Sequence, residues 1–193
     1  MRREHSVDPA WFEALYRDQG DPWAFETSPY ERAKYDHTLA SLPRPTFDSV
    51  LEVGCANGVL TRRLAERCRQ LTAVDVSETA LAAARLRCAD LPHVTLENRR
   101  LPADGPAGPY DLVLLSEVIY YWDGNDLARA AAYLADIVPP GGSVLLVHWT
   151  GDTDYPKSGD EAVAELRGLL GDTVTVMTEE QRPNYRLDLW CRR

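Results

Sequence analysis

A loop with two glycines follows a short apolar run near residue 50. The segment Glu52-Val53-Gly54-Cys55-Ala56-Asn57-Gly58 has the spacing E-x-G-x-x-x-G between a predicted strand and a predicted helix. Gly54 permits a tight turn, and Gly58 permits helix and strand to approach closely. A dinucleotide-binding loop carries a further glycine at the position of Ala56, where the pyrophosphate enters. The loop therefore indicates a ligand with a nucleoside and no diphosphate.

A carboxylate ends the next predicted strand, 23 residues after Glu52. There, Asp75 can accept both hydrogen bonds of a ribose diol. The alternative reading of Asp75 is a turn or helix-capping residue, because Ser77 follows closely. The two glycines taken alone also fit an ordinary turn between a strand and a helix.

Four side chains are candidates for a general base: Glu117, Asp123, His37 and His148. His148 follows a predicted strand, and histidine is the side chain that exchanges protons near neutral pH. The alternative for His148 is a packed or solvent-facing residue at a strand end, since most histidines are not catalytic.

Aromatic residues gather in two parts of the chain. Tyr120, Tyr121 and Trp122 follow the fourth predicted strand and can form a wall for a sugar or a face toward a methylsulfonium. Their alternative role is packing beneath a loop. A second group can close a cleft as a lid or pin the N-terminal segment by packing: Trp23, Phe25, Tyr30 and Tyr35.

The composition excludes several classes of protein. The 193 residues include 21 basic and 30 acidic ones, and a net charge of −9 disfavours nucleic acid and anionic membranes as partners. No apolar segment approaches the roughly 18 residues of a membrane span, and the N-terminus has no apolar signal core. The four cysteines form no C-x-x-C pair, so we expect neither a disulfide framework nor a metal site. A cytoplasmic protein is the expectation.

The elements that must position these residues alternate along the chain. The pattern predicts helices over 9–18, 29–42, 58–69, 77–89, 125–138 and 160–170, and strands over 50–53, 71–74, 93–97, 110–115, 143–148, 173–178 and 185–191. Alternation followed by two successive strands predicts a mostly parallel seven-stranded α/β sheet with one antiparallel strand and helices on both faces. We expect an N-terminal helical lid over residues 1–45 and a single Rossmann-like domain over 46–193.

Four segments together carry a resemblance to a known group of enzymes. The chain resembles the class I S-adenosylmethionine-dependent methyltransferases over about residues 47–191, through Leu51–Gly58, Thr72–Ser77, Tyr110–Val113 and Pro139–Gly142. More narrowly, it looks like the nodulation protein S family of N-methyltransferases, which is linked to methylating the amine of a de-acetylated chitooligosaccharide. The narrower likeness rests on Asp21–Trp23, Ser28–Tyr35, Ser116–Tyr121 and His148-Trp149.

The resemblance assigns roles to individual residues. It implies S-adenosylmethionine as cofactor, bound by Tyr30, Lys34, Glu52, Gly54, Ala56, Gly58, Asp75, Val76, Glu97, Asn98, Arg99 and Ser116. Within this set, Asp75 takes the ribose hydroxyls, Glu97 is placed toward adenine, and Tyr30 and Lys34 are placed toward the methionine carboxylate. We also expect Trp23, Tyr120, Tyr121 and Trp149 at the substrate, with His148 and Glu117 as catalytic candidates.

The sequence thus predicts a methyltransferase acting on a small molecule, by N-methylation of an amino sugar or related amine. The alternatives are an O-methyltransferase of the same fold and, more remotely, an NAD-dependent oxidoreductase or a non-catalytic cofactor-binding module. The expected partners are a small amine or sugar and no nucleic acid or membrane, in a monomer or homodimer.

Overall fold

Seven segments of the sequence form strands, and every helix of ten or more residues begins at a side chain that caps it. The computed structural model describes residues 2–193 and divides into two units, residues 8–99 and residues 2–7 with 100–193. The strands are β1 (Phe47–Val53), β2 (Cys68–Asp75), β3 (Val94–Asn98), β4 (Leu112–Ser116), β5 (Ser143–Trp149), β6 (Val174–Gln181) and β7 (Tyr185–Arg192). The helices are α1 (Pro9–Gln19), α2 (Pro29–Ala40), α3 (Val59–Leu64), α4 (Glu78–Arg87), α5 (Gly124–Ile137) and α6 (Gly159–Leu170).

The strands have the order β3-β2-β1-β4-β5-β7-β6 in the sheet. Strands β1, β2 and β3 pair in parallel, as do β4 and β5, whereas β7 is antiparallel to both β5 and β6. This confirms the predicted α/β class and the mostly parallel sheet with one antiparallel strand.

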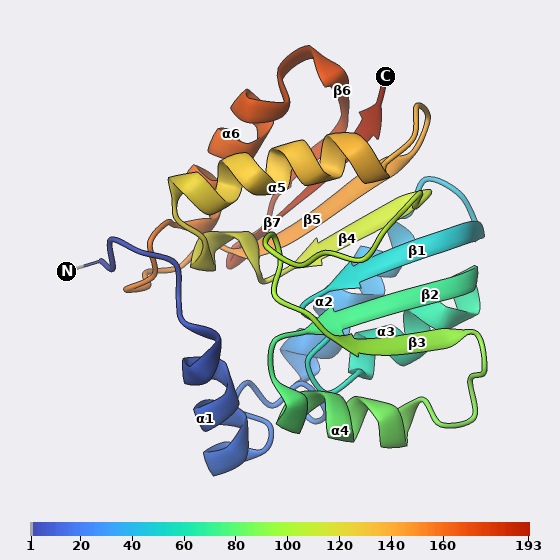
Figure 1. Ribbon diagram of the computed structural model, residues 1–193, viewed down its shortest axis with the longest axis vertical. Coiled ribbons are helices and arrows are strands. Elements are labelled where there is room, and N and C mark those ends of the chain that lie inside the picture. The colour runs from blue at the N-terminus through green and yellow to red at the C-terminus, as the bar shows by residue number, and fades with distance from the viewer. Residues whose placement is uncertain (1) are drawn as a thin grey trace. The chain divides into compact units, whose positions relative to one another are not determined.

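In the unit of residues 8–99, parallel pairing brings the carboxyl ends of three strands together. Val53 at the end of β1 pairs with Val74, and Asp75 at the end of β2 pairs with Asn98. Helix α4 begins at Ser77, whose hydroxyl accepts the Ala80 amide at 3.1 Å. Helix α1 packs on α4, and the two lie side by side in Figure 1.

The second N-terminal helix, α2, starts as its sequence predicts. The Ser28 hydroxyl accepts the Glu31 amide at 3.3 Å, and Pro29 occupies the first helical position. The helix ends at Ala40, two residues before the predicted end, ahead of the Pro43-Arg44-Pro45 segment that cannot continue it. The expected helices of the N-terminal segment are therefore present, while its action as a lid stays a prediction.

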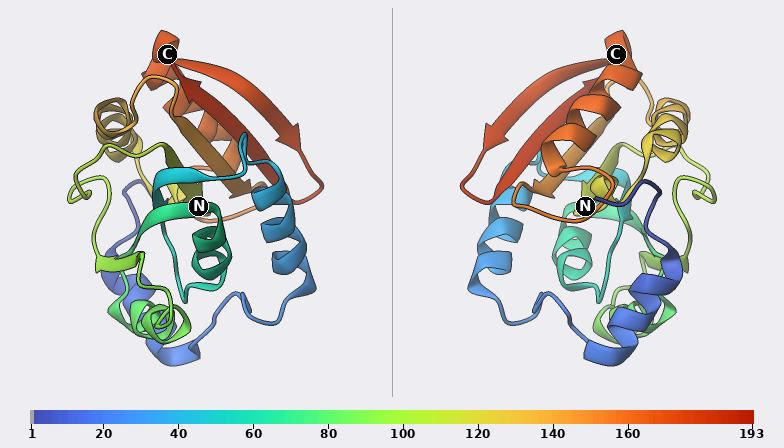
Figure 2. Two further views of the ribbon diagram at one scale, coloured as in Figure 1. Left: turned by 90° about the vertical axis from the view of Figure 1, so that its right-hand side faces the viewer. Right: turned by 90° about the vertical axis from the view of Figure 1, so that its left-hand side faces the viewer.

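In the unit that contains residues 100–193, helices α5 and α6 pack against each other beside the strands (Figure 1). Strands β6 and β7 curve together as an antiparallel pair (Figure 2). Four consecutive residues of β4, Leu112–Leu115, are at most 1% exposed, as in a strand covered on both faces. Helix α5 is capped by Asp123, and α6 by a capping box between Ser158 and Glu161.

The largest departure from the predicted boundaries lies between α3 and β2. The helix expected over 58–69 ends at Leu64, a short 3-10 turn follows, and β2 begins at Cys68 instead of residue 71. Arg69 and Gln70 are exposed and polar, so hydrophobic pattern places them outside the strand. Their backbone nevertheless continues the β1–β2 pairing, with Gln70 opposite Ser49.

Two further features bear on the function. Across residues 2–193, none of the helices combines the length and the apolar character that crossing a membrane demands. The same residues contain no cluster of three or more His, Cys, Asp or Glu side chains suited to a metal ion.

Candidate functional site

The glycine loop, residues 54–58, turns through backbone conformations that few residues adopt. Gly54, Ala56 and Gly58 all have positive φ angles, of 77°, 50° and 79°. The carbonyl of Val74 in β2 accepts the amides of Gly54 and Cys55 at 2.8 and 3.1 Å. The loop is therefore held against the end of β2, with left-handed residues at three of its five positions.

Asp75 organises this loop as well as ending β2. One of its carboxylate oxygens accepts the Ala56 amide and the other accepts the Ser77 amide, both at 2.9 Å. Burial raises the pKa of Asp75 above its usual value, although the backbone hydrogen bonds oppose that shift. Two carboxylate oxygens offer about four acceptor positions, so these two bonds leave capacity for a ribose diol. The ribose role of Asp75 stays a prediction.

Gly58 is required by helix packing. A Cβ atom at Gly58 would lie 2.9 Å from the Cβ and 3.0 Å from the Cα of Ala84 in α4. The sequence predicted a close approach of helix and strand at Gly58, whereas the close approach in the structure is made to α4. A larger residue at either position would push the glycine loop away from this helix.

Three polar atoms near the glycine loop are buried and make no well-formed hydrogen bond within the described protein: Glu52 Oε2, Asn57 Oδ1 and Thr61 Oγ1. The Thr61 hydroxyl is nevertheless close enough to Glu52 to oppose the rise in the pKa of that carboxyl that burial causes. Glu52 lies one residue before the end of β1 and is 1% exposed. Burial raises the pKa of Glu52 to about 8, so the carboxyl carries a proton at neutral pH. Buried polar atoms without partners are uncommon in native proteins and mark places where a polar ligand fits.

Residues at and after the end of β3 donate hydrogen bonds to the backbone carbonyl of Asp75. The Asn98 side chain donates to that carbonyl at 3.2 Å, and the Arg99 amide donates to it at 3.1 Å. The Arg99 guanidinium pairs with Glu97 at 2.8 Å. Asn98 and Arg99, together with the half-buried Val76, thus adjoin Asp75, and the predicted adenine contact of Glu97 stays untested.

Tyr30 and Lys34 lie one turn apart on α2. The Lys34 ammonium is 3% exposed, pairs with Glu31 at 3.0 Å and lies 5.3 Å from the centre of the Tyr30 ring. The sequence analysis did not single out Glu31, although its i, i+3 spacing from Lys34 is a usual one for an ion pair. A buried ammonium with three donors can serve Glu31 and a ligand carboxylate together.

The predicted substrate residue Trp23 packs beside the glycine loop. Tyr16, Ala56 and Ala80 form a buried cluster, with Trp23 and Phe25 packed against it. The Trp23 and Phe25 rings stack with their centres 5.6 Å apart. The N-terminal segment therefore covers Ala56 of the loop, an arrangement that fits both the lid and the packing hypothesis.

Two carboxylates that the sequence analysis did not single out, Glu13 and Glu26, connect the N-terminal segment to α4. Glu13 of α1 accepts the hydroxyls of Ser77 and Thr79 at 2.8 and 2.6 Å, and these hydrogen bonds lower the pKa of Glu13 to about 2. Glu26 pairs with Arg87, whose Nε donates to the Asn57 carbonyl at 2.9 Å. No local sequence pattern relates these partners, because they lie 30 to 66 residues apart.

In the other unit, the turn of residues 117–121 follows Ser116, the last residue of β4. Glu117 has a positive φ of 57°, which is unfavourable for a residue with a side chain. Its Oε2 accepts the Tyr120 hydroxyl at 2.6 Å and the Trp149 amide at 2.8 Å. The carboxylate is thus fixed between the ends of β4 and β5.

His148 lies beside this turn and is fully buried. Its Nε2 accepts the amides of Val118 and Ile119 at 3.4 and 3.3 Å. Its ring meets the Tyr120 ring edge to face, with the centres 5.4 Å apart. The sequence analysis named His148 and Glu117 as separate candidate bases, and the structure brings their two side chains to the same turn.

A tyrosine cluster, formed by Tyr120, Tyr121 and Tyr155, continues from Glu117. Tyr155 stacks on Tyr120 at 5.4 Å and meets Tyr121 edge to face at 4.5 Å. Burial, reinforced for Tyr120 by the Glu117 charge, raises the pKa values of Tyr120 and Tyr121 well above the usual value. Both phenols therefore stay neutral hydrogen-bond donors. Tyr155 escaped the sequence analysis because its loop lacks any motif.

Of the two remaining candidate bases, Asp123 is engaged as a helix cap, and His37 lies on α2. Asp123 caps α5 and accepts the Ser6 amide at 3.2 Å. Burial opposes ionisation of Asp123, but backbone hydrogen bonds outweigh it and lower the pKa below its usual value. His37 occupies the last turn of α2, where its carbonyl accepts the Ser41 amide at 3.0 Å.

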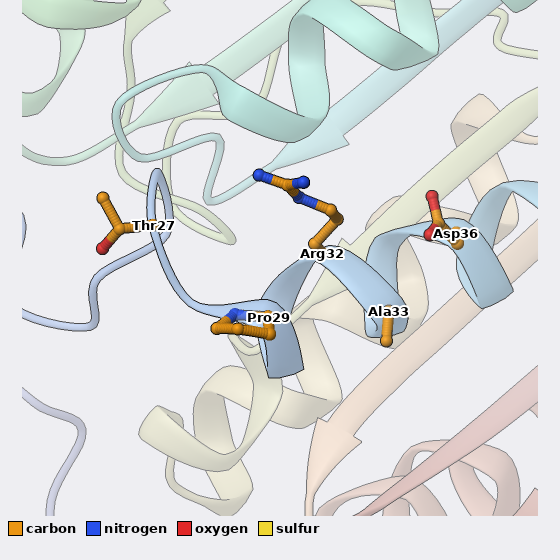
Figure 3. Close-up of a pocket in the computed structure, with 5 residues that line it drawn as sticks. All are labelled: Thr27, Pro29, Arg32, Ala33 and Asp36. Atoms are coloured by element: carbon orange, nitrogen blue, oxygen red, sulfur yellow. The ribbon is translucent and has the colours of Figure 1, made fainter.

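A shallow hollow lies on an exposed stretch of α2 and the segment before it. Thr27, Pro29, Arg32, Ala33 and Asp36 line it, as Figure 3 shows. The residues of α2 in this set recur every three or four positions, so they share one helix face. None of the five is a buried polar residue, and none was predicted to bind cofactor or substrate.

Known proteins resemble the chain over most of its length. A family model described as nodulation protein S (NodS) matches residues 13–146. Nodulation protein S from Rhizobium tropici is 32% identical over 171 residues, which are 88% of this chain and 69% of that protein. The chain covers only 59% and 61% of two further nodulation protein S relatives.

Solved structures share the fold. A putative methyltransferase from Pseudomonas syringae is 38% identical, with a TM-score of 0.74 over 84% of this chain and 99% of that one. N-methyltransferase NodS from Bradyrhizobium japonicum, in complex with S-adenosyl-L-homocysteine, has a TM-score of 0.84 over 96% of this chain and 99% of that one. Its 22% identity makes this second likeness one of fold.

Proposed function

This chain belongs to the nodulation protein S family of S-adenosylmethionine-dependent methyltransferases, and we propose that it N-methylates the amino group of an amino sugar or a related small amine. The Glu117 carboxylate, fixed beside three tyrosines, is the observation that carries this proposal. A carboxylate next to aromatic faces suits an acceptor that arrives as an ammonium ion.

The unit of residues 8–99 fits the cofactor. The left-handed glycine loop, the Asp75 carboxylate and the buried, unpartnered Glu52 Oε2 supply a backbone cradle and polar groups for a nucleoside amino acid. Asp75 would hold the ribose hydroxyls and Lys34 the methionine carboxylate. S-adenosylmethionine, when bound, supplies a methyl group that is already reactive toward nucleophiles.

The acceptor amine must lose a proton before its nitrogen lone pair can attack. We assign this proton to the Glu117 carboxylate, which takes it from the ammonium nitrogen and leaves a neutral amine. Tyr120, kept neutral by burial, donates to Glu117 and holds one carboxylate oxygen in place. The nitrogen then forms the bond to the methyl carbon as the bond between sulfur and that carbon breaks. The bonding pair stays on sulfur, neutral S-adenosylhomocysteine leaves, and the positive charge passes to the ammonium product.

The tyrosine cluster holds the acceptor and excludes water. Tyr120 and Tyr121 are at most 9% exposed, so the phenol rings form a dry wall beside the carboxylate. Exclusion of water strengthens the attraction between a carboxylate and an ammonium ion. The same wall suits the apolar face of a sugar ring.

Matched acceptors test this proposal. With labelled S-adenosylmethionine, the full-length protein should methylate a glucosamine oligosaccharide that has a free amine, and not the same oligosaccharide with that amine acetylated. Glu117→Gln should lower kcat by about 10²- to 10⁴-fold, the usual contribution of a general base, while the dissociation constant of S-adenosylhomocysteine stays unchanged. Glu179→Gln, on exposed β6, is the control and should retain full activity. Equal methylation of the acetylated oligosaccharide, or full activity of Glu117→Gln, would refute the proposal.

A further inference from the structure

His148 is engaged through the nitrogen that a general base would need. The side chain is 0% exposed, and its Nε2 accepts hydrogen bonds from both Val118 and Ile119. An unprotonated imidazole nitrogen has a single in-plane lone pair, which two amides share here. This sharing accounts for the long distances of 3.4 and 3.3 Å. Nε2 is therefore without a proton in this arrangement, which assigns the ring proton to Nδ1.

The turn that His148 contacts is the one that presents Glu117. Glu117 has an unfavourable positive φ, and such a conformation persists only where surrounding contacts hold it. Two sets of hydrogen bonds link the turn to β5. In one, a side chain of the turn accepts an amide of β5, and in the other, a side chain of β5 accepts amides of the turn. The Glu117 side chain accepts the Trp149 amide, and the neighbouring His148 side chain accepts amides of the turn itself.

His148 also supports the tyrosine that touches Glu117. Its ring packs edge to face on Tyr120, and Tyr120 donates to Glu117 at 2.6 Å. Loss of the His148 contacts would therefore release both the backbone of the turn and the phenol that holds the carboxylate. A displacement of about 1 Å at a reacting group can cost about 100-fold in rate.

We propose that His148 is a positioning residue, whose unprotonated Nε2 holds the turn of residues 117–121 so that Glu117 and Tyr120 keep their places. The effect of His148 on catalysis rests on the proposed function of Glu117, whereas its effect on the turn does not. What the position requires is a hydrogen-bond acceptor at the place of Nε2. The competing assignment is the general base that the sequence suggested.

A pair of substitutions separates the two roles. The side-chain amide of His148→Gln reaches about as far as Nε2 and can accept an amide hydrogen bond, but it cannot act as a base near neutral pH. The side chain of His148→Met has a similar length and offers only a weak acceptor. If His148 positions the turn, His148→Gln should retain the amide protection and the activity that His148→Met loses. If His148 is the base, both variants should lose activity alike.

The first readout is amide hydrogen exchange in the full-length protein. We expect the Val118 and Ile119 amides to be protected in wild type and in His148→Gln, and to exchange at least tenfold faster in His148→Met. Protection that is equal in all three proteins would overturn the proposal. A ¹⁵N spectrum of the wild-type imidazoles gives a check without any substitution, because it should show a protonated Nδ1 and an unprotonated Nε2. A protonated Nε2 at neutral pH would overturn the assignment.

The second readout is turnover of an amine acceptor. We expect kcat of His148→Gln within about tenfold of wild type and kcat of His148→Met at least about 100-fold lower, with unchanged affinity for S-adenosylhomocysteine in both. An equal loss of kcat in both variants, with the amides still protected in His148→Gln, would make His148 the base. If no amine is a substrate, the exchange and ¹⁵N results still decide the positioning role, and only the proposed function fails.

Discussion

Replacing Asp75 by asparagine tests how one carboxylate serves both the protein and the cofactor. Each Asp75 oxygen accepts one backbone amide at 2.9 Å, from Ala56 on one side and Ser77 on the other. In Asp75→Asn one oxygen becomes an NH₂ donor, so one amide faces a donor whichever way the side chain turns. An unpaired buried amide costs about 1–3 kcal/mol, and we expect the free energy of unfolding to decrease by that amount.

The same substitution should weaken cofactor binding. Hydrogen bonds to a charged group contribute about 1.5–3 kcal/mol, so losing the ribose contact should raise the dissociation constant about 10- to 150-fold. Isothermal titration calorimetry with S-adenosylhomocysteine measures this change. A 2′,3′-dideoxy analogue of the ligand separates direct contact from loop distortion, because it lacks the hydroxyls that Asp75 would bind.

The analogue should bind wild type and Asp75→Asn with similar affinity, since the interaction that the substitution removes is absent. Ser77→Ala is the control. It keeps the amide that bonds Asp75, and it removes a helix cap contributing about 1 kcal/mol together with the hydroxyl that donates to Glu13, so it lowers stability without a comparable loss of affinity. The ribose assignment would be refuted if Asp75→Asn weakened the natural ligand and the dideoxy analogue equally.

Three other substitutions test the unit of residues 8–99 by urea unfolding. Folded Glu52 keeps its proton up to about pH 8 and unfolded glutamic acid releases it near pH 4.5, so wild-type stability declines as pH rises through this window. Glu52→Gln should therefore gain stability over wild type between pH 4.5 and 8, by up to about 5 kcal/mol, and a constant difference would contradict the raised pKa. The pKa of Glu13 is lowered from 4.5 to about 2, so the stability that its carboxylate contributes should be complete above pH 4.5 and be lost as pH decreases toward 2. The free energies of unfolding of wild type and Glu13→Gln should therefore converge in acid, and a difference that persists there would disprove the charged contact. Gly58→Ala should destabilise the protein by about 1–3 kcal/mol more than Gly141→Ala, which shares a positive φ but has no atom within 4 Å of the new Cβ; equal losses would exclude the Ala84 collision.

The parts of the fold that the sequence predicted correctly are determined by residues that lie close together in the chain. Ser28 before Pro29 marks the start of α2, and the alternation of strands and helices predicts a mostly parallel sheet with one antiparallel strand, which is β7 in the structure. The glycine loop and Asp75 could be placed together because parallel strands end at one edge of a sheet. The predicted start of β2 is three residues too late, because backbone pairing with β1, and not a hydrophobic pattern, keeps the first residues in the strand.

The parts of the site that sequence did not predict depend on long-range contacts. Glu13 and Glu26 reach partners on α4 that are 61 to 66 residues away, and Tyr155 joins its cluster from an irregular loop. His148 shows the same limit in another form. Its place at the end of β5 follows from the sequence, but the amides that occupy its Nε2 appear only when the turn after β4 is built.

The most direct test of the central claim is to determine which atom of the acceptor receives the methyl group. The full-length protein would be incubated with S-adenosylmethionine carrying a ¹³C-labelled methyl group and a partly de-acetylated glucosamine oligosaccharide, and the product examined by NMR. We predict a labelled methyl group bonded to the free amine nitrogen, formed in wild type and reduced at least about 100-fold in Glu117→Gln. Label on a hydroxyl oxygen, or a wild-type protein that binds S-adenosylhomocysteine yet labels no amine, would contradict it.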